Sequence, residues 1–247
     1  MAVKKRKPEK RSFIIWKILW FILKIPYYII KGIYNLIRFT TKMVEEEKIL
    51  KKRDSMVPIY EEFKMIKKNS GNYEIWEKNV NTSDSKIGII IGARGTGKTA
   101  FGLKLLENSR AKYKRNCYAM GFDKDEMPNW ITSIEKVEEL KNDSIVLIDE
   151  GGILFNSRKF MSSANKLLSD LILISRHKNL SIIFISQNSS NLEVNVLRQA
   201  DFLVLKPSSL LQKDFERKIV KEIYKKAQTD FEKFKNIKGL THIYSED

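Results

Sequence analysis

The chain has 247 residues, 43% of them hydrophobic, so it can bury a core of domain size and is not a disordered chain. Its single cysteine, Cys117, excludes an internal disulfide, and with only His177 and His242 beside it we expect no structural zinc and a reducing cytoplasm. The net charge of +16 is concentrated at the start, because residues 1–42 hold eleven Lys and Arg against one Glu. Such an arm attracts polyanions, either an anionic membrane surface or nucleic acid, and composition does not choose between them.

Residues 1–42 combine a basic leader with an apolar segment, residues 12–41, that indicates a membrane. Within it, residues 13–39 predict a helix of about 40 Å, long enough to cross a bilayer. Basic residues recur at every seventh position and form a polar seam, at Lys17, Lys24, Lys31 and Arg38. A spanning helix would bury Lys24 at a cost of about 2.5 to 3.5 kcal/mol, whereas a helix in the membrane plane turns the seam to the headgroups. We therefore expect an amphipathic surface helix, with a transmembrane helix and a helix packed on protein as alternatives.

Beyond the arm, residues 43–85 are charged and polar and suggest a connector, and residues 86–247 form the expected globular domain. In that domain short apolar runs alternate with helical patterns. The runs lie at 87–91, 117–122, 145–148, 182–185 and 202–205, and the helices at about 98–108, 133–141, 162–176 and 212–235. Because the runs do not alternate in polarity, they indicate strands buried on both faces, as in a parallel sheet. The pattern predicts a three-layer α/β sandwich, closed by a short strand within 239–245.

The first apolar run leads directly into a phosphate-binding loop of the form Gly-x-x-x-x-Gly-Lys-Thr, with a helical pattern behind it. Its glycines permit positive φ angles, so backbone N–H groups can surround phosphate oxygens at the positive end of the helix. Lys98 is expected to reach the β- and γ-phosphates, and the Thr99 hydroxyl to bind Mg²⁺. The motif predicts ATP and Mg²⁺ binding by Gly92, Ala93, Arg94, Gly95, Thr96, Gly97, Lys98, Thr99 and Ala100.

Two later runs end in polar side chains that complete the predicted site. Asp149 and Glu150 follow the run 145–148, which places them at the carboxyl edge of the sheet beside the loop. Asp149 is predicted to hold magnesium through water, and Glu150 to polarise the attacking water as general base. Gln187 follows the run 182–185 and is interpreted either as a sensor of the γ-phosphate or as the mere end of a strand.

These elements resemble, in type and order, the additional-strand, catalytic-glutamate division of P-loop ATPases, and within it the HerA/FtsK group of DNA-pumping motors. Residues 175–179 and 196–201 are similar to the ATPase domain of the Zot (zonular occludens toxin) family, the assembly proteins of filamentous phages. Viral packaging ATPases and conjugation coupling proteins share the outline. The resemblance covers about residues 86–210 and implies a sheet order 5-1-4-3-2 and a homo-oligomeric ring, often hexameric. The apolar segment precedes the ATPase here, whereas Zot-type proteins usually carry it afterwards.

A ring ATPase commonly borrows an arginine from a neighbouring subunit, and Arg158, Arg176 and Arg198 are the candidates. Arg94 is expected to face solvent or a neighbour, and His177 is interpreted as a helix-terminal residue without chemistry. The predicted function is an ATP-hydrolysing motor at the cytoplasmic face of a membrane, driving DNA translocation, packaging or virion export. The alternative is an ATP-gated switch or assembly factor. A small-molecule kinase fits poorly, because the sequence shows no lid rich in Arg.

Overall fold

The computed structural model describes residues 10–149, 151, 161–192, 194–209 and 212–246. Contacts within the chain divide it into two compact units, Met1–Lys52 and Arg53–Asp247. The first unit is a helical arm, and the second contains the sheet and the predicted nucleotide site.

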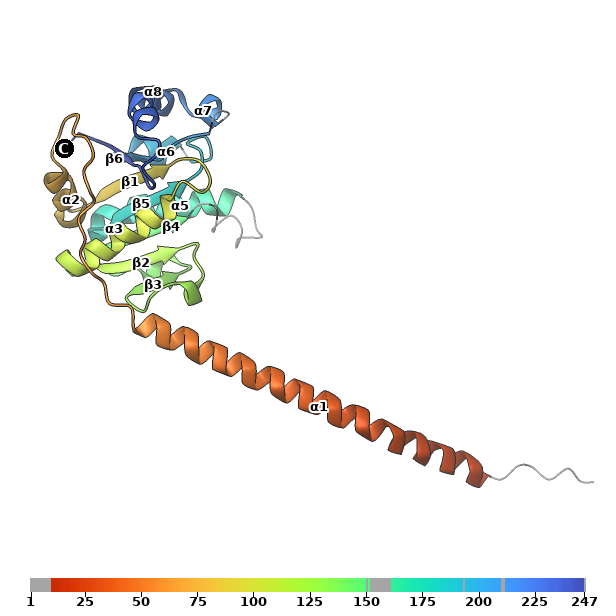
Figure 1. Ribbon diagram of the computed structural model, residues 1–247. Helices are drawn as coiled ribbons and strands as arrows, with labels where there is room; N and C mark the ends of the chain where they lie inside the picture. Colours follow the sequence, from red (N-terminus) through yellow and green to blue (C-terminus); the bar gives the residue numbers. More distant parts are fainter. Residues whose placement is uncertain (1–9, 150, 152–160, 193, 210–211, 247) are drawn as a thin grey trace, which may run out of the picture. The chain divides into compact units, whose positions relative to one another are not determined.

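Helix α1 (Lys10–Asp54) makes up the described part of the arm (Figure 1). It continues past the expected end at residue 39, and ion pairs one helical turn apart support this extension, at Lys42–Glu46 and Glu47–Lys51. Large apolar side chains stand exposed along it, among them Trp20, Tyr27, Ile30, Ile33, Tyr34, Leu36, Ile37 and Phe39. Among the residues that the structure describes, no helix is long and apolar enough to cross a membrane, so the transmembrane alternative is not found there.

The second unit is built on a seven-stranded sheet in the order β3-β2-β4-β5-β1-β6-β7 (Figure 1). The strands are β1 (Lys86–Ile91), β2 (Asn116–Met120), β3 (Ile131–Ile134), β4 (Ser144–Asp149), β5 (Ser181–Ser186), β6 (Phe202–Leu205) and β7 (His242–Ser245). Every pairing is parallel except that of β6 with β7. The parallel strands therefore all end at one edge, where ligands of open α/β sheets bind.

The observed sheet order differs from the expected five-stranded order because two further strands lie at its edges. The five predicted runs correspond to β1, β2, β4, β5 and β6, which stand among themselves as β6-β1-β5-β4-β2. Strand β3 extends one edge where a helix was expected at 133–141, and only the short 3₁₀ turn η2 (Val137–Glu139) follows it. Strand β7 extends the other edge, as expected from the pattern at 239–245. Strand β3 has only four residues, which carry too little periodicity to have been recognised from sequence.

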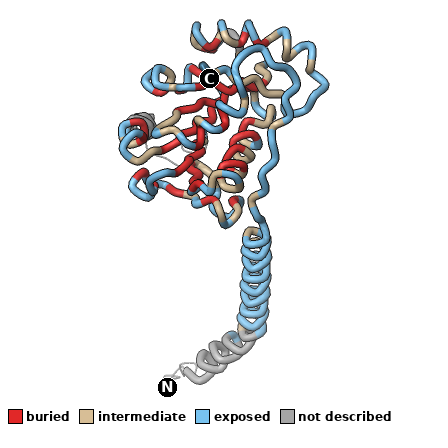
Figure 2. The backbone as a smooth tube through the Cα atoms, turned by 90° about the vertical axis from the view of Figure 1, so that its left-hand side faces the viewer, coloured by how far each residue is buried: buried red, intermediate tan, exposed pale blue. Residues whose placement is uncertain are grey.

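Helices cover both faces of the sheet and make three layers, as predicted. They are α2 (Tyr73–Thr82), α3 (Lys98–Tyr113), α5 (Met161–Lys178), α6 (Val194–Arg198), α7 (Gln212–Phe215) and α8 (Lys218–Lys233), with a 3₁₀ turn η1 (Lys124–Glu126). Side chains alternate across β1: Ile89 packs in a core with Leu171 of α5 and Tyr224 of α8, whereas Ile90 packs with Leu105 of α3 and Trp76 of α2. The buried residues gather on the sheet and on the inner faces of these helices (Figure 2).

Part of the segment expected as a connector belongs to the core. Helix α2 begins after Asn72, whose side chain caps it by accepting a hydrogen bond from the Glu74 N–H at 2.9 Å. It buries Trp76 and Val80, which are 2% and 1% exposed. The preceding residues, 55–72, are called the strap here, because they run without regular structure over α3. The globular unit thus begins well before residue 86.

Candidate nucleotide site

The phosphate loop joins β1 to α3 with the geometry that anion binding needs. Gly95 and Gly97 have φ angles of 77° and 84°, in the left-handed region that favours glycine. Gly97 is also the N-cap of α3, so no side chain caps the helix there, and its first turn holds no acidic residue. The first-turn N–H groups and the positive end of the helix dipole are therefore left for an anion.

Lys98 is buried at the start of α3, and its amine lies against the loop. It donates hydrogen bonds to the carbonyl oxygens of Gly92 at 2.8 Å and Ala93 at 2.9 Å. Burial lowers the pKa of Lys98, and the negative charge of Asp149 opposes this shift. A phosphate would offer the amine charged acceptors, which make stronger hydrogen bonds than neutral carbonyls. Within the loop, the Thr96 hydroxyl also donates to Ala93 O at 2.7 Å.

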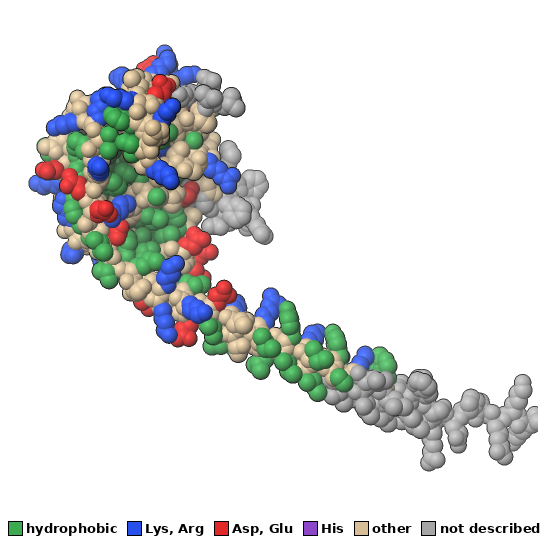
Figure 3. All heavy atoms as spheres, in the orientation of Figure 1, with side chains coloured by type: hydrophobic (Ala, Val, Ile, Leu, Met, Phe, Trp, Pro, Cys, Tyr) green, Lys and Arg blue, Asp and Glu red, His purple; other side chains and the backbone are tan. Residues whose placement is uncertain are grey.

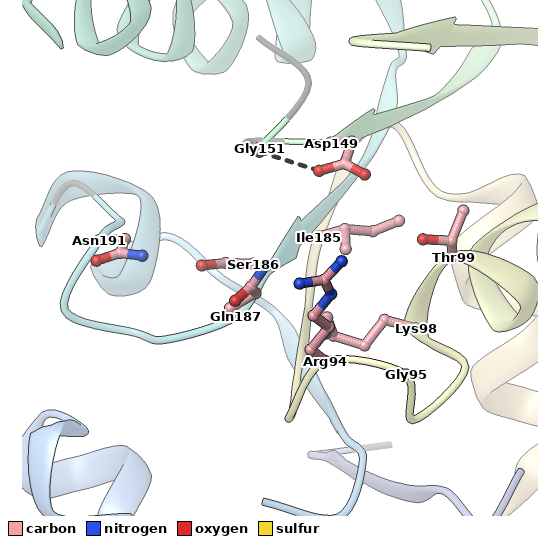
Figure 4. Close-up of a pocket in the computed structure, with 10 residues that line it drawn as sticks. All are labelled: Arg94, Gly95, Lys98, Thr99, Asp149, Gly151, Ile185, Ser186, Gln187 and Asn191. Carbon is pink, nitrogen blue, oxygen red and sulfur yellow. Dashed lines mark hydrogen bonds between the residues drawn. The ribbon is translucent and has the colours of Figure 1, made fainter. Parts of the chain in front are cut away.

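The structure places Asp149 beside this loop, although about fifty residues separate the two in the sequence. Asp149 is the last residue of β4 and pairs with Ile185 of β5. The residue after Ile185, Ser186, pairs with Ile91, the last residue of β1. Its carboxylate accepts a hydrogen bond from the Gly151 N–H at 3.0 Å. Figure 4 shows Asp149 and Thr99 bordering the same space from β4 and α3. A strand, β5, thus lies between the strand of the loop and the strand of the carboxylate.

One pocket of about 330 Å³ joins these groups (Figure 4). The predicted site residues that line it are Arg94, Gly95, Lys98, Thr99, Asp149 and Gln187. Arg94 remains exposed to solvent while lining the pocket. The residues that sequence reasoning missed are Gly151, Ile185, Ser186 and Asn191. The polar turn after β5 could have indicated Asn191 as a pocket residue, since loops at this edge of a parallel sheet face the ligand.

Thr99 and Asp149 supply the donors that a magnesium ion prefers. A hydroxyl and a carboxylate are hard oxygen ligands, and Mg²⁺ usually takes only one or two protein ligands, completing its shell with water and substrate phosphates. Within the described part of the chain no group of three His, Cys, Asp or Glu side chains is placed to hold a metal by itself. The residues present fit an ion that arrives with a nucleotide.

The segment after β5 is held by hydrogen bonds to Gln212 of α7 and to Glu216, in the turn between α7 and α8. The Gln187 carbonyl accepts a hydrogen bond from the Gln212 side chain, which also donates to Glu216 at 3.1 Å. Glu216 is buried and accepts from the Ser189 N–H at 2.8 Å. This anchoring leaves the Gln187 side chain exposed at the pocket. Sequence reasoning missed the roles of Gln212 and Glu216, because their partners lie more than twenty residues away.

The remaining predicted residues lie elsewhere. Glu150 and Arg158 fall outside the described residues. Arg176 is exposed in the last turn of α5, which leads into the first residue of β5, and Arg198 is exposed at the end of α6 before β6. Both therefore lie near the edge where the strands begin, opposite the phosphate loop of their own chain. His177 is exposed beside Arg176.

No protein-family model and no curated protein matches the chain. Among solved structures, the genome packaging NTPase B204 from Sulfolobus turreted icosahedral virus 2 is similar at 13% identity over 66% of this chain and 94% of that one, with a TM-score of 0.46. The DnaC helicase loader aligns at 18% identity over 55% of this chain and 85% of that one, with a TM-score of 0.38. The KaiC-like protein PH0186 from Pyrococcus horikoshii OT3 aligns at 12% identity over 49% and 72%, also with 0.38. All three TM-scores lie below 0.5, so these similarities carry no argument about function. A function for the chain has to be argued from its own site.

Proposed function

We propose that this chain is a P-loop ATPase that binds ATP with Mg²⁺ and hydrolyses it. One observation carries the proposal: the fold gathers Lys98, Thr99 and Asp149 from two separate parts of the sequence around one pocket of about 330 Å³. An amine, a hydroxyl and a carboxylate at the open end of a helix are the groups that hold a triphosphate and its metal.

Each residue has a defined task in this mechanism. The N–H groups of the loop and of the first turn of α3 bind the phosphates, and Lys98 exchanges two carbonyl acceptors for phosphate oxygens. When bound, Mg²⁺ neutralises the charge that develops on the phosphates; Thr99 would hold it directly and Asp149 through water. We assign Glu150 as general base and Gln187 as sensor of the γ-phosphate, because one follows Asp149 in sequence and the other lines the pocket.

At a finer level, the proposed activity is that of a membrane-associated motor of the HerA/FtsK/Zot type, working as a homo-oligomeric ring. Three features support this assignment: a strand between β1 and β4, a sensor residue anchored to α7, and a basic, apolar arm. Arg176 and Arg198 lie opposite their own loop, so in a ring they would act on a neighbouring subunit's nucleotide. DNA is the proposed polymer. An ATP-gated assembly factor at a membrane is the alternative.

The test measures ATP hydrolysis by the full chain, with and without single- and double-stranded DNA. Lys98→Ala should abolish nucleotide binding, whereas Glu150→Gln should bind ATP but hydrolyse it at least about 100-fold more slowly. Stimulation by DNA supports the motor, and slow turnover indifferent to DNA supports the switch. No Mg²⁺-dependent affinity for any nucleoside triphosphate would refute the ATPase itself. A shortened fragment should begin at residue 53, because a start near residue 80 removes the buried Trp76.

A further inference from the structure

A second lysine, Lys206, lies directly against the phosphate loop, although no sequence motif marks it. It is the residue after β6, which pairs in parallel with β1. Its N–H donates to Ile91 O at 2.8 Å, and the Ala93 N–H donates to Pro207 O at 3.0 Å. The ladder between β1 and β6 therefore continues into the loop on both sides of Gly92.

The backbone of the loop approaches Lys206 so closely that residue 92 must be glycine. A Cβ on Gly92 would lie 2.5 Å from the Lys206 Cβ and 3.0 Å from its carbonyl oxygen, both too short for ordinary contacts. Gly92 has a negative φ, so its need for glycine comes from this contact rather than from its backbone conformation. Lys206 and the first glycine of the loop are thus packed as one unit.

The side chain of Lys206 extends beneath the loop to the start of α3. Its amine lies 4.0 Å from where a Cβ on Gly97 would be, and 5.3 Å from the centre of the Phe101 ring. The residue is only 2% exposed. Its amine donates to Gly239 O at 2.8 Å and to the Thr241 hydroxyl at 2.5 Å, in the segment that leads into β7.

The charge of Lys206 is therefore buried, with neutral oxygens as its hydrogen-bond partners. Burial alone lowers the pKa of its amine, to about 8, and the described carboxylates do not offset that shift. A buried cation without a counter-charge is costly, and a polyphosphate bound in the loop above it would supply that charge. The main chain of Lys206 is held as well, since its carbonyl accepts from the Tyr224 hydroxyl of α8 at 3.2 Å.

We propose that Lys206 is a positioning residue of the nucleotide site, whose buried amine strengthens polyphosphate binding from beneath the loop and links that binding to the C-terminal segment 239–241. This proposal rests on the proposed function, because it assumes that the loop binds a nucleotide. Contacts in the C-terminal segment then adjust nucleotide affinity: removing an acceptor there frees the amine to shift away from the loop.

The test compares dissociation constants of ATP, ADP and AMP for the full chain and for Lys206→Met, which keeps the length of the side chain without its charge. ATP binding should weaken by about tenfold, and AMP binding much less, because Coulomb energy grows with the number of phosphate charges. Lys238→Met is the matched control; it removes a charge from an exposed lysine next to Gly239 and should change none of the three constants.

Thr241→Val should weaken ATP binding by a smaller factor than Lys206→Met does. The double variant should bind ATP as weakly as Lys206→Met alone, because both substitutions act through the same amine. Circular dichroism and thermal melting establish that each variant is folded; if Lys206→Met does not fold, Thr241→Val alone carries the test, with the same preference for ATP over AMP. Unchanged ATP affinity in the folded variants, or an equal loss for all three nucleotides, would overturn the proposal. If the unsubstituted chain binds no nucleotide, the proposed function fails instead.

Discussion

At the scale of single residues, the site depends on where charges are placed and how deeply they are buried. Lys98 and Asp149 lie at one pocket, where the negative charge of Asp149 opposes the lowering of the pKa of Lys98 by burial. Their positions differ: the lysine starts a helix at the phosphate loop, and the aspartate ends a strand and lines the same pocket as Thr99 (Figure 4). Affinity for phosphate and affinity for the metal should therefore be separable.

Substituting Asp149 by Asn should test that separation. The variant keeps its shape but loses the charge that holds magnesium, so Mg²⁺ should no longer increase ATP affinity by more than about threefold, while metal-free binding changes little. Titration calorimetry with and without Mg²⁺ measures both values. Asp84→Asn, an exposed carboxylate before β1, is the control. Full Mg²⁺ dependence in the Asp149 variant would remove this residue from the metal site.

The lowered pKa of Lys206 predicts a pH dependence of stability. Its folded pKa of about 8 lies below its ordinary value of 10.5, so between these pH values the unfolded state binds more protons and stability rises with pH. Relative to Lys206→Met, the unsubstituted chain should gain up to about 3 kcal/mol in free energy of unfolding from pH 7 to pH 10.5. Urea unfolding at both pH values measures the difference. A constant difference across this range would contradict the charge burial.

At the scale of elements, the strap and α2 fasten the amino-terminal part of the globular unit to α3. Phe63 of the strap stacks on Phe101 of α3, with ring centres 4.6 Å apart. The Glu61 N–H donates to the Asn108 side chain at 3.1 Å, and Asn108 donates back to the Glu61 carbonyl at 2.8 Å. Because Phe101 lies two residues after Thr99, the strap contacts the same helix that begins at the phosphate loop.

A buried carboxylate, Glu77 of α2, is the centre of this attachment. It is 1% exposed and accepts hydrogen bonds from Lys112 at 2.6 Å, Tyr60 at 3.1 Å, Tyr73 at 3.2 Å and Tyr113 at 3.4 Å. Charged hydrogen-bond networks of this kind are strong when complete and costly when broken.

Glu77→Gln should lower the free energy of unfolding by about 2 kcal/mol, because the amide cannot accept all four bonds and carries no charge for Lys112. Hydrogen exchange should increase most in the strap, where Tyr60 lies. Glu74→Gln, in the exposed first turn of the same helix, should lower the free energy of unfolding by less than about 1 kcal/mol, through the helix dipole alone, and should not raise exchange in the strap. Exchange that rises equally throughout the globular unit would show that the network does not hold the strap in particular.

At the scale of the whole molecule, the chain combines a globular unit that contains the candidate nucleotide site with an arm of a different character. Along the described part of α1, apolar and basic side chains alternate on the surface (Figure 3). Exposed aromatic residues occur among them, including Tyr27, Tyr28 and Tyr34. Such a helix lowers its free energy by lying in a membrane interface, with rings among the acyl chains and lysines near anionic headgroups.

Vesicle binding should therefore depend on the arm and on lipid charge. The full chain should sediment with vesicles of phosphatidylglycerol and phosphatidylcholine, whereas the fragment 53–247 should remain in solution. Neutral phosphatidylcholine vesicles should bind the full chain more weakly, and added salt should reduce the difference between the two lipids. Equal sedimentation of the fragment and the full chain would contradict a membrane role for α1.

The sequence by itself determined the features that depend on residues adjacent along the chain. The phosphate loop needs its glycines, Lys98 and Thr99 in one short stretch between a strand and a helix, and the buried strands β1, β4 and β5 show as unbroken apolar runs. Their order along the chain also placed Asp149 at the correct edge. These features are local, so periodicity and residue type suffice to find them.

Only the tertiary structure decided which distant residues meet. Lys206 lies under the loop because β6 pairs with β1, and the four partners of Glu77 converge from the strap, α2 and α3. Strand β3 forms where a helix was expected because β2 pairs with it, since four residues carry little preference of their own. Burial and pairing across the sheet are long-range properties, and a single sequence read for local pattern does not contain the distances that create them.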